Sequence, residues 1–527
     1  MSLIRTAGVL LLAVLSLPLP GAAQELRIAL RSEPTSLDPQ YQNIASNNQI
    51  AAHLFEALVA RSDKQLAIPG LAVSWKPVGD TVWEFKLRPD VKFHDGSPFT
   101  AQDVVFTFAR AAKVPNSPSP FTSITRQITK LETIDPLTLR IHTAAPAPLL
   151  PLDLSGLPIL SHIAAGGGAP EGRTTVELER GDGLVGTGPF KFVVWRRGTE
   201  LVVARNDDYW GEKPAWSRVT FRPIGSGAAR LAALLAGEFD VAEDPPVAEL
   251  AFLRKDARVA LAEAVTNRLI FIALDHAGEP SPGIPDAGAR NPLKDKRVRQ
   301  ALSQAIDRKA LTEKTMEGLG VPAGDFLPWP AFGTARTVQP ERFDPAVARK
   351  LLADAGYANG FSLALGAPNG RYLYDLKVAQ AVVAMWKAVG IRADVEAAAP
   401  AAFFKNRDEY RYSAYLSGWT SESGEMSNPL RALVATPNRE KGMGGTNRGR
   451  YSNPAMDAKL EEALRTVDDR RRETLLQEAS RLVLADHGVL PLHFELAVWA
   501  MRRDLAYSGR TDQATLAQFI RPRPATR

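Results

Sequence analysis

Arg-Pro-Asp-Val-Lys-Phe-His-Asp-Gly-Ser-Pro-Phe-Thr-Ala-Gln-Asp-Val-Val-Phe-Thr-Phe, the stretch from Arg88 to Phe108, combines the end of a strand, a turn and the start of a helix. Asp95-Gly96 predicts the turn, because glycine tolerates a positive φ. Thr100 can accept hydrogen bonds from free helix N–H groups, and Asp103 suits the positive end of a helix. The stretch therefore predicts a strand, a turn and a capped helix, and it contains no pattern typical of catalysis.

Three further stretches, far apart in the chain, complete a pattern with the first. They are Gly186-Thr187-Gly188-Pro189-Phe190 with Arg205-Asn206-Asp207-Asp208-Tyr209-Trp210-Gly211, Arg297-Val298-Arg299-Gln300-Ala301-Leu302 ending in Ala305-Ile306-Asp307-Arg308, and Arg450-Tyr451-Ser452-Asn453-Pro454 with Asp457. In this order they resemble the signatures of the family 5 extracytoplasmic solute-binding proteins, the peptide-binding receptors of ABC importers. The resemblance extends from Ile28 to Trp499, nearly the whole chain after the N-terminal segment.

The resemblance implies an α/β fold, the two-lobed periplasmic binding protein fold with hinge crossovers and an extra subdomain in the first lobe. The length agrees with this, since 527 residues exceed the about 250–300 at which a single core stops growing. Strand and helix patterns also alternate along the chain. The predicted limits are a signal peptide at 1-23, a first lobe at 24-270 with an inserted subdomain near 60-185, a second lobe at 271-488, and a return to the first lobe at 489-527.

The N-terminus predicts export. Arg5 precedes an apolar run from Ala7 to Leu17, and small residues follow, so we expect a cleavable signal peptide cut after Ala23. The apolar run is short for a membrane span; the alternative is a retained membrane anchor. Because the chain has no cysteine, it cannot carry a lipid on that residue, and we expect a free periplasmic protein.

Composition narrows the function classes. A hydrophobic fraction of 45% and a charged fraction of 23% describe a soluble globular protein. Absence of cysteine excludes disulfides, thiolate metal sites and cysteine nucleophiles. The chain is basic, but Lys and Arg are dispersed, so no nucleic-acid partner is expected. We find no hydrolase motif and no metal-ligand spacing among the seven histidines, and therefore predict no enzyme activity, no cofactor and no metal.

The resemblance also places candidate ligand contacts. In peptide-binding relatives a Trp-x-x-Asp element supplies a carboxylate for the ligand amine, and here Trp419-Thr420-Ser421-Glu422 stands at the matching place. Glu422 keeps the charge and lengthens the side chain by one methylene; Glu425 is the alternative if the register slips. Trp419 offers an apolar or cation-binding face, or else belongs to the core.

The ligand carboxylate needs a cation, since an unpaired buried charge is costly. Arg371, in the loop that also contains Asn369 and Tyr372, is the first candidate. Arg431 and Arg448 are alternatives, and each of the three also reads as a surface arginine. In the family, the residues just after Leu37-Asp38-Pro39 lie at the cleft mouth, which makes Tyr41 and Asn43 candidates; an exposed polar loop is the other interpretation.

The resemblance therefore predicts a monomeric periplasmic substrate-binding protein of an ABC importer. It would capture a small peptide or peptide-like solute by closure of two lobes and deliver it to the inner-membrane permease. Relatives with the same fold bind opines, glutathione, oligosaccharides, metal chelates or haem, so a non-peptide ligand is the alternative. A periplasmic hydrolase is the remaining rival.

Overall fold

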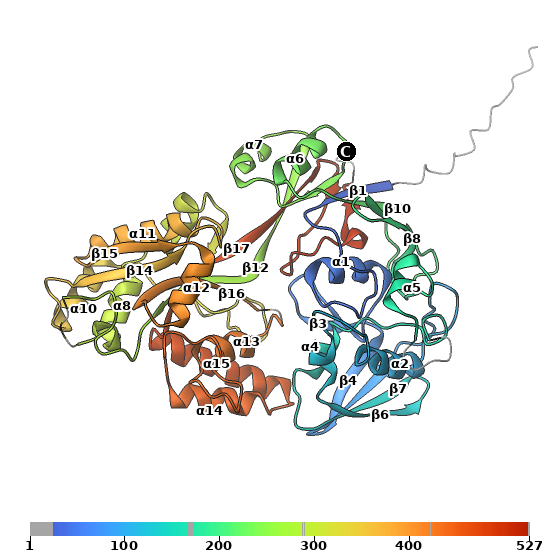
Figure 1. Cartoon of the computed structure of the whole chain (residues 1–527), viewed down its shortest axis with the longest axis horizontal. Helices are drawn as coiled ribbons and strands as arrows, with labels where there is room; N and C mark the ends of the chain where they lie inside the picture. Colours follow the sequence, from blue (N-terminus) through green and yellow to red (C-terminus); the bar gives the residue numbers. More distant parts are fainter. Residues whose placement is uncertain (1–24, 167–171, 287, 289, 422, 525–527) are drawn as a thin grey trace, which may run out of the picture.

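The computed structural model describes residues 25–166, 172–286, 288, 290–421 and 423–524. These residues form two lobes that are joined by long strands, with the chain passing twice between them (Figure 1). The predicted α/β, two-lobed fold is confirmed. The predicted signal peptide lies outside the described residues, and the residue limits of the lobes stay predictions. In the described part of the chain, no helix is long and apolar enough to cross a membrane.

One mixed sheet runs through both lobes. Among the described residues it has eleven strands in the order β15-β14-β16-β12-β17-β11-β1-β10-β9-β8, with β13 beside β17. The first-lobe elements are β1 (Glu25–Leu30), α1 (Ala45–Leu54), α5 (Thr175–Arg180), β8 (Phe190–Arg196), β9 (Glu200–Arg205), β10 (Arg218–Pro223), α6 (Gly227–Leu235), β11 (Val241–Glu243) and α7 (Leu250–Leu253). The second-lobe elements are α8 (Lys296–Gln304), α9 (Arg308–Ala310), β13 (Gly320–Pro322), α10 (Pro345–Asp354), β14 (Ser362–Pro368), α11 (Asp375–Lys387), β15 (Arg392–Ala398), α12 (Pro400–Asp408), β16 (Ala414–Thr420), α13 (Ser427–Pro429), α14 (Pro454–Ala463) and α15 (Asp469–Ala485).

A smaller sheet, in the order β4-β5-β7-β6, forms a subdomain with its own core beside the first lobe. Its elements are β2 (Val59–Arg61), β3 (Ala67–Pro69), β4 (Ala72–Gly79), β5 (Val82–Leu87), α2 (Ala101–Ala111), α3 (Thr122–Thr125), β6 (Ile128–Asp135), β7 (Thr138–Thr143) and α4 (Leu150–Leu154). The stretch that opened the sequence analysis lies here. Thr100 and Asp103 form the predicted cap of α2 as a reciprocal capping box, and Gly96 has a φ of 87° at the predicted turn.

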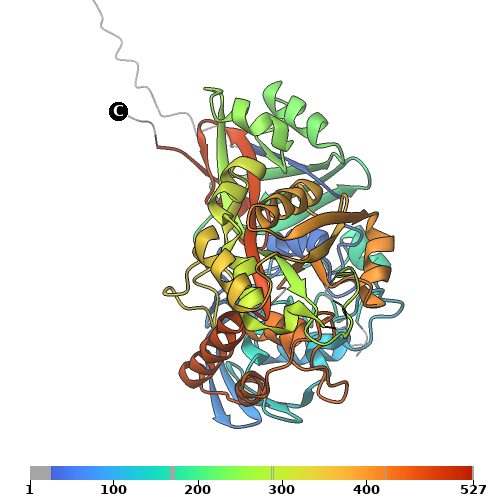
Figure 2. The same ribbon diagram turned by 90° about the vertical axis from the view of Figure 1, so that its left-hand side faces the viewer.

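Two antiparallel strands, β12 (Val259–Leu274) and β17 (Val489–Arg502), connect the lobes. Figure 1 shows β12 and β17 running between the two lobes, and in Figure 2 the red strand β17 runs lengthwise through the molecule. Alternate side chains of a strand point to opposite faces. Ile270, Ile272 and Leu274 accordingly enter the core under α8, α10 and α11, whereas Leu269, Phe271 and Ala273 enter the core under α12, α14 and α15. The second lobe therefore has a helical layer on each side of its sheet.

The Gly-Thr-Gly-Pro-Phe and Tyr-Trp-Gly runs meet at one buried carboxylate. Glu56 accepts hydrogen bonds from Thr187 Oγ1, Tyr209 Oη and Trp210 Nε1, each at 2.8 Å. Burial raises the pKa of Glu56 to about 7, although the three donors lower it. Gly186 passes so close to the Leu54 carbonyl that a Cβ would overlap it. These signature residues therefore hold α1 against the start of β8.

The Arg297–Arg308 run also has a structural role. The Arg299 guanidinium donates to the carbonyl oxygens of Leu293 and Asp486, at 3.0 and 2.8 Å. Arg308 Nε donates to the Pro491 carbonyl oxygen at 2.6 Å. Both arginines thus fix α8 and α9 to the point where β17 begins.

The C-terminal segment, which includes β18 (Leu505–Ala506) and β19 (Arg521–Pro522), packs on the first lobe. Thr515 Oγ1 donates to the buried Glu243 carboxylate at 2.6 Å. The Ala517 N–H donates to His53 Nε2 at 3.0 Å, which fixes that buried ring as a neutral acceptor at this nitrogen. The turn at Ala517–Phe519 is therefore part of the first-lobe core.

Candidate ligand-binding site

A cavity of about 530 Å³ lies in the second lobe, where the carboxyl ends of β14 and β16 meet. Because β14 and β16 are parallel, the loops that follow them lie at one edge of the sheet, which is where open α/β sheets bind ligands. Its described lining residues are Arg268, Phe271, Arg371, Tyr372, Phe404, Arg407, Tyr415, Ser417, Gly418, Trp419, Thr420, Asn428, Leu433 and Thr446. The lining combines aromatic rings with arginines, and its volume suits a ligand of a few residues.

The loop between β14 and α11 presents two of the predicted residues. The Asp375 carboxylate accepts hydrogen bonds from the backbone N–H groups of Gly370, Arg371 and Tyr372, at 3.1, 2.7 and 3.1 Å. This arrangement fixes the loop backbone, while the Arg371 side chain is exposed, with its guanidinium carbon 5.4 Å from the centroid of the Tyr372 ring and no ion pair to another described residue. Arg371 is therefore a positioned cation that is free to meet a ligand.

Trp419 and Tyr372 form the aromatic wall. Trp419 is half-buried against the core and donates from Nε1 to Asn428 Oδ1 at 2.9 Å. Tyr372 Oη donates to the Gly418 carbonyl oxygen at 3.3 Å. A Cβ at Gly418 would lie 2.7 Å from the Tyr372 ring, so glycine is needed for this contact. Trp419 therefore packs against the core and also lines the cavity. The sequence analysis had offered these two roles as alternatives, and the structure combines them.

Arg268 lies on β12, directly opposite Thr420 in the β12–β16 register. Its Nε donates to Thr420 Oγ1 at 2.9 Å, and its Nη1 pairs with Glu495 Oε2 at 3.2 Å. Burial raises the pKa of Glu495, while the charges of Arg268 and Arg371 lower it. The two strands that join the lobes therefore each contribute a charged group beside the cavity.

A second arginine cluster lies toward the other end of β16. Arg407 pairs with Asp408 at 2.8 Å and stacks over Phe404, with 4.7 Å from its guanidinium carbon to the ring centroid. Arg448 pairs with the same Asp408 carboxylate at 3.2 Å. Tyr415, which is buried, lies within the field of both arginines. Arg407 and Arg448 share the Asp408 carboxylate, so these three side chains together carry one net positive charge at this end of the cavity.

The structure brings together four of the eight sequence-predicted contacts. Arg371, Tyr372, Trp419 and Thr420 line the cavity. Asn369 is exposed at the start of the same loop, outside the lining, and Glu422 lies outside the described residues.

The alternative contacts named in the sequence analysis, Glu425, Arg431 and Arg448, do not line the cavity either. Glu425 is fully buried and pairs with Arg472 at 2.9 Å. Arg431 donates to the carbonyl oxygens of Lys441 and Gly442. Arg448 reaches the cavity only through the carboxylate that it shares with Arg407.

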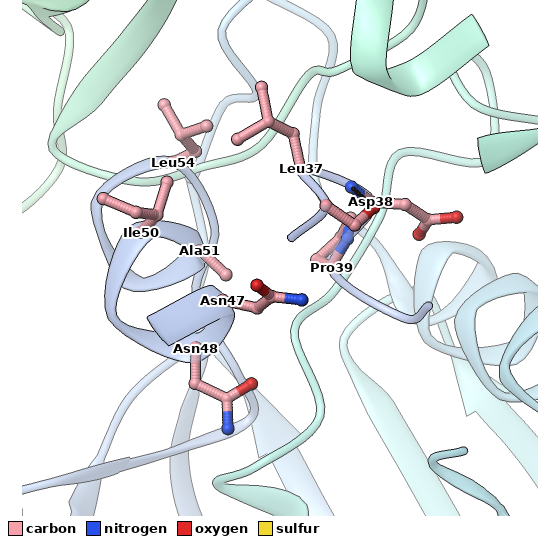
Figure 3. A pocket seen from close by; sticks show the side chains of 9 residues that line it. Leu37, Asp38, Pro39, Asn47, Asn48, Ile50, Ala51 and Leu54 are labelled. Atoms are coloured by element: carbon pink, nitrogen blue, oxygen red, sulfur yellow. Dashed lines mark hydrogen bonds between the residues drawn. The ribbon is translucent and has the colours of Figure 1, made fainter. Parts of the chain in front are cut away.

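Tyr41 and Asn43 lie in the first lobe, in the loop between β1 and α1. The Asn43 N–H donates to the Ser119 carbonyl oxygen at 2.9 Å, and Asn43 Oδ1 accepts from Asn48 Nδ2 at 2.8 Å. The hollow between this loop and α1 has essentially no free volume, and the Asp38 carboxylate points away from the helix (Figure 3). This loop is therefore held by its own contacts and is separate from the second-lobe cavity.

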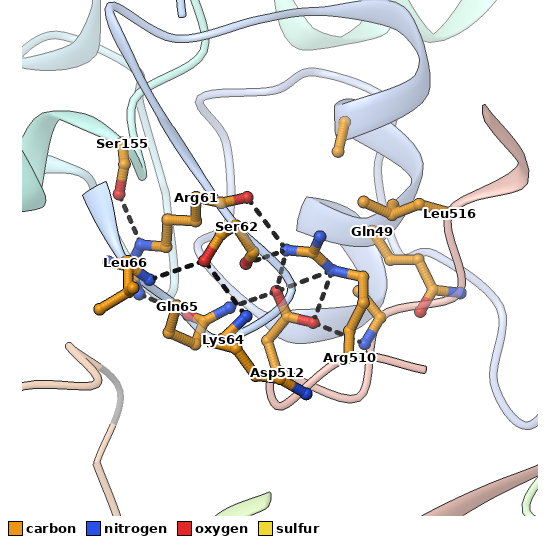
Figure 4. A network of polar contacts seen from close by, with 12 residues as sticks. Gln49, Arg61, Ser62, Lys64, Gln65, Leu66, Ser155, Arg510, Asp512 and Leu516 are labelled. Carbon is orange, nitrogen blue, oxygen red and sulfur yellow. Dashed lines mark hydrogen bonds and ion pairs between the residues drawn. The ribbon is translucent and has the colours of Figure 1, made fainter. Parts of the chain in front are cut away.

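A polar network of the first lobe contacts the second lobe beyond Thr420. Arg510 pairs with Asp512 at 2.8 Å, and Gln65 Nε2 donates to Asp512 Oδ2 at 2.6 Å (Figure 4). Gly424, whose φ is 67°, approaches Gln65 so closely that a Cβ would lie 2.8 Å from the Gln65 Cβ. The hairpin β2–β3 is thus the first-lobe element next to the loop that follows β16.

The sequence analysis missed several lining residues, namely Arg268, Phe271, Phe404, Arg407 and Tyr415. One signal was present for Arg268, because it is a charged residue directly before the apolar run from Leu269 to Leu274. Among the described residues, no group of three His, Asp or Glu side chains could hold a metal ion.

Comparison with known proteins gives a consistent result. Residues 67–441 match the family described as bacterial extracellular solute-binding proteins, family 5. The chain is 30% identical over 491 residues to the glutathione-binding protein GsiB of Pectobacterium atrosepticum, covering 92% of this chain and 91% of that protein. The GsiB of Salmonella paratyphi A is 28% identical over 492 residues, with the same coverage.

Solved structures agree in fold. HbpA2 from Haemophilus parasuis superposes with a TM-score of 0.81 at 25% identity, over 95% of this chain and 100% of that chain. MppA, a periplasmic murein tripeptide binding protein in its unliganded open form, gives a TM-score of 0.81 at 25% identity, over 95% and 98% of the two chains. The chain therefore belongs to the family 5 bacterial extracellular solute-binding proteins and acts as a solute receptor for an ABC transporter.

Proposed function

We propose that this receptor captures a small peptide or peptide-like solute with both an amine and a carboxylate, and that the second-lobe cavity is its binding site. The observation that carries the proposal is the cavity itself, in which Arg371 and Trp419 stand together at the carboxyl ends of two parallel strands. A relative named for glutathione and a structural neighbour named for a murein tripeptide support this ligand class. Glutathione, a γ-linked tripeptide, falls within the class.

Binding would close the first lobe over the cavity. The structure is similar to an unliganded open form, and closure adds contacts that exist only with ligand present. In this account Arg371 binds the ligand carboxylate, Glu422 binds the ligand amine, and Trp419, Thr420 and Tyr372 contact the middle of the ligand. Asn369 borders the site. Tyr41 and Asn43 are the proposed contacts from the first lobe.

The remaining parts of the proposal concern the mature protein. We expect cleavage of a signal peptide after Ala23, release into the periplasm without a lipid anchor, and a monomer that delivers its ligand to an inner-membrane ABC permease. The chain would bind and release its ligand without chemical change. The lobes would follow the predicted limits, with 271-488 as the lobe that carries the cavity.

Glu422→Gln tests the amine contact. The substitution keeps the size of the side chain and removes its charge, so we expect at least a tenfold loss of affinity for a free-amine tripeptide such as trialanine. N-acetyl-trialanine lacks the ammonium group, so the same substitution should change its affinity by less than twofold. Isothermal titration calorimetry on the purified protein measures both. Equal losses for the two peptides, or none, would remove Glu422 from this role.

A further inference from the structure

The lining of the cavity falls on two faces of β16, because successive residues of a strand point to opposite faces. Gly418 lies on the face that Tyr372 covers, as the close approach of the Tyr372 ring shows. Tyr415, Ser417 and Trp419 alternate with Gly418 and therefore point to the other face. That second part of the cavity is called the α12 compartment here, and its described lining residues are Phe271, Phe404, Arg407, Tyr415, Ser417, Trp419, Asn428, Leu433 and Thr446.

Aromatic rings form much of the wall of the α12 compartment. Phe404 lies on α12 next to the fully buried Phe403, whose ring meets the Tyr415 ring edge-on with the centroids 6.4 Å apart. Phe271 lies on β12, directly opposite Ser417 in the register of the two strands, and so shares its face. Walls of this kind suit a flat ring, because aromatic pairs gain stability beyond the apolar area that they bury.

Arg407 adds a hydrogen-bond donor to these walls. It lies three residues after Phe404 on α12, so the two side chains share a helix face, and its guanidinium carbon is 4.7 Å from the centroid of the Phe404 ring. Its Nε and Nη2 both donate to Asp408 Oδ1, at 2.9 and 2.8 Å, whereas Nη1 makes no hydrogen bond to a described residue. One carboxylate and one ring therefore hold the guanidinium and leave a donor for a ligand oxygen.

Other polar atoms of the α12 compartment also lack partners among the described residues. Tyr415 Oη and Ser417 Oγ belong to side chains of residues that are only 5% and 3% exposed. Asn428 Oδ1 accepts from Trp419 Nε1, which fixes the orientation of the amide and leaves Nδ2 as a donor. Buried polar groups without partners are costly, so these atoms favour a ligand group that brings an oxygen or a hydroxyl into the compartment.

The charge at this end disfavours one class of ligand side chain without requiring another. The net positive charge shared by Arg407, Arg448 and Asp408 repels a lysine or arginine side chain. The Arg448 and Asp408 side chains are 25% and 46% exposed, so water screens that charge and no ligand anion is needed to balance it. A neutral side chain is therefore compatible with the α12 compartment.

We propose that the α12 compartment is a specificity pocket for a tyrosine-like side chain of the ligand, with the ring against Phe271 and Phe404 and the phenol oxygen on Arg407. The proposal rests on the proposed function, to which it adds the recognition of a side chain. Glutathione has no aromatic group, so the proposal gives this receptor a ligand preference different from that of the relatives named for glutathione.

Calorimetry with matched tripeptides tests the pocket on the purified protein. Tyr, Phe, Leu or Glu is placed at the first, second or third position of an otherwise all-alanine tripeptide. At one position we expect the Tyr peptide to bind at least tenfold more tightly than trialanine and about fivefold more tightly than the Phe peptide.

Two variants separate the contributions to this preference. Arg407→Met removes the donor and keeps an apolar side chain, so it should reduce the preference for Tyr over Phe to less than twofold while leaving the affinity for trialanine nearly unchanged. Phe404→Ala removes a wall, so it should weaken the Tyr and Phe peptides by about tenfold and trialanine by less than twofold.

The control is Arg349→Met, at an exposed arginine on α10 outside the cavity, which should leave every preference intact. The pocket proposal is wrong, and the proposed function stands, if trialanine binds but no Tyr peptide binds more tightly, if the Glu or Leu peptides bind most tightly, or if Arg407→Met weakens the Tyr and Phe peptides equally. If no tripeptide binds at all, the proposed function itself is overturned, and this proposal with it.

Discussion

Replacement of Asp38 by alanine should lower the free energy of unfolding by about 3–5 kcal/mol. Asp38 and Arg110 form a buried ion pair, with 1% and 2% of their surfaces exposed. Arg110 Nη1 and Nη2 bond the two carboxylate oxygens at 2.9 and 2.7 Å. Thr175 Oγ1 donates to the same carboxylate at 2.7 Å. The substitution would leave the buried Arg110 guanidinium without its counter-charge. An unpaired buried charge lowers the stability of the folded state far more than the loss of an exposed ion pair does.

Chemical denaturation of the wild type and the variant, followed by tryptophan fluorescence, measures this loss. The matched control is Asp354→Ala, which removes an exposed carboxylate paired with Lys350 on α10. That pair is solvated, so we expect its loss to cost less than about 1 kcal/mol. A similar, small loss for both variants would show that the Asp38–Arg110 pair does not stabilise the first lobe.

Arg371→Gln should weaken binding of trialanine by about 30-fold or more. In the proposed complex the Arg371 guanidinium pairs with a ligand carboxylate that lobe closure removes from water. Removal of one member of such a pair typically costs about 2–5 kcal/mol. The C-terminal amide of the same peptide has no carboxylate, so its weaker affinity should change little in the variant.

Arg431→Gln is the matched control, because Arg431 is an exposed arginine of the same lobe whose side chain, among the described residues, bonds the backbone carbonyls of Lys441 and Gly442. It should leave the affinities of both peptides unchanged. Calorimetric titration of the three proteins with both peptides separates the outcomes. An unchanged affinity of Arg371→Gln for trialanine would show that another arginine binds the terminal carboxylate.

The sequence predicted the class of fold because its four signature runs form local structures or buried contacts that tolerate few other residues. The capping box of Thr100 and Asp103 involves only neighbouring residues and could be derived directly. The role of Thr187 could not be derived from the sequence, because its hydrogen-bond partner Glu56 is 131 residues away. Arg299 and Arg308 likewise bond backbone carbonyls that only the folded chain brings near. The signatures therefore identify the scaffold and carry little information about the ligand.

The candidate site was partly predictable for the same reason. Trp419 lies at the carboxyl end of β16 and Arg371 follows β14, at the sheet edge where α/β folds bind ligands, so their positions follow from element order. Arg268 depends on the pairing of β12 with β16 and β17, whose residues lie more than a hundred positions away in sequence. The place of Arg407 in the cavity lining depends on how α12 packs on the sheet, where Phe403 of α12 meets Tyr415 of β16. The charged position of Arg268 before an apolar run was a partial signal, but neither the strand pairing nor the helix packing can be read from neighbouring residues.

The most direct test of the central claim is native mass spectrometry of the mature protein purified from the periplasm, followed by release and identification of the bound molecule. The account predicts one small peptide-like solute per protein monomer, bearing an amine and a carboxylate, and lost from the Arg371→Gln variant. Co-purification of an oligosaccharide or a metal chelate in its place would contradict the assignment of the second-lobe cavity to a peptide-like ligand.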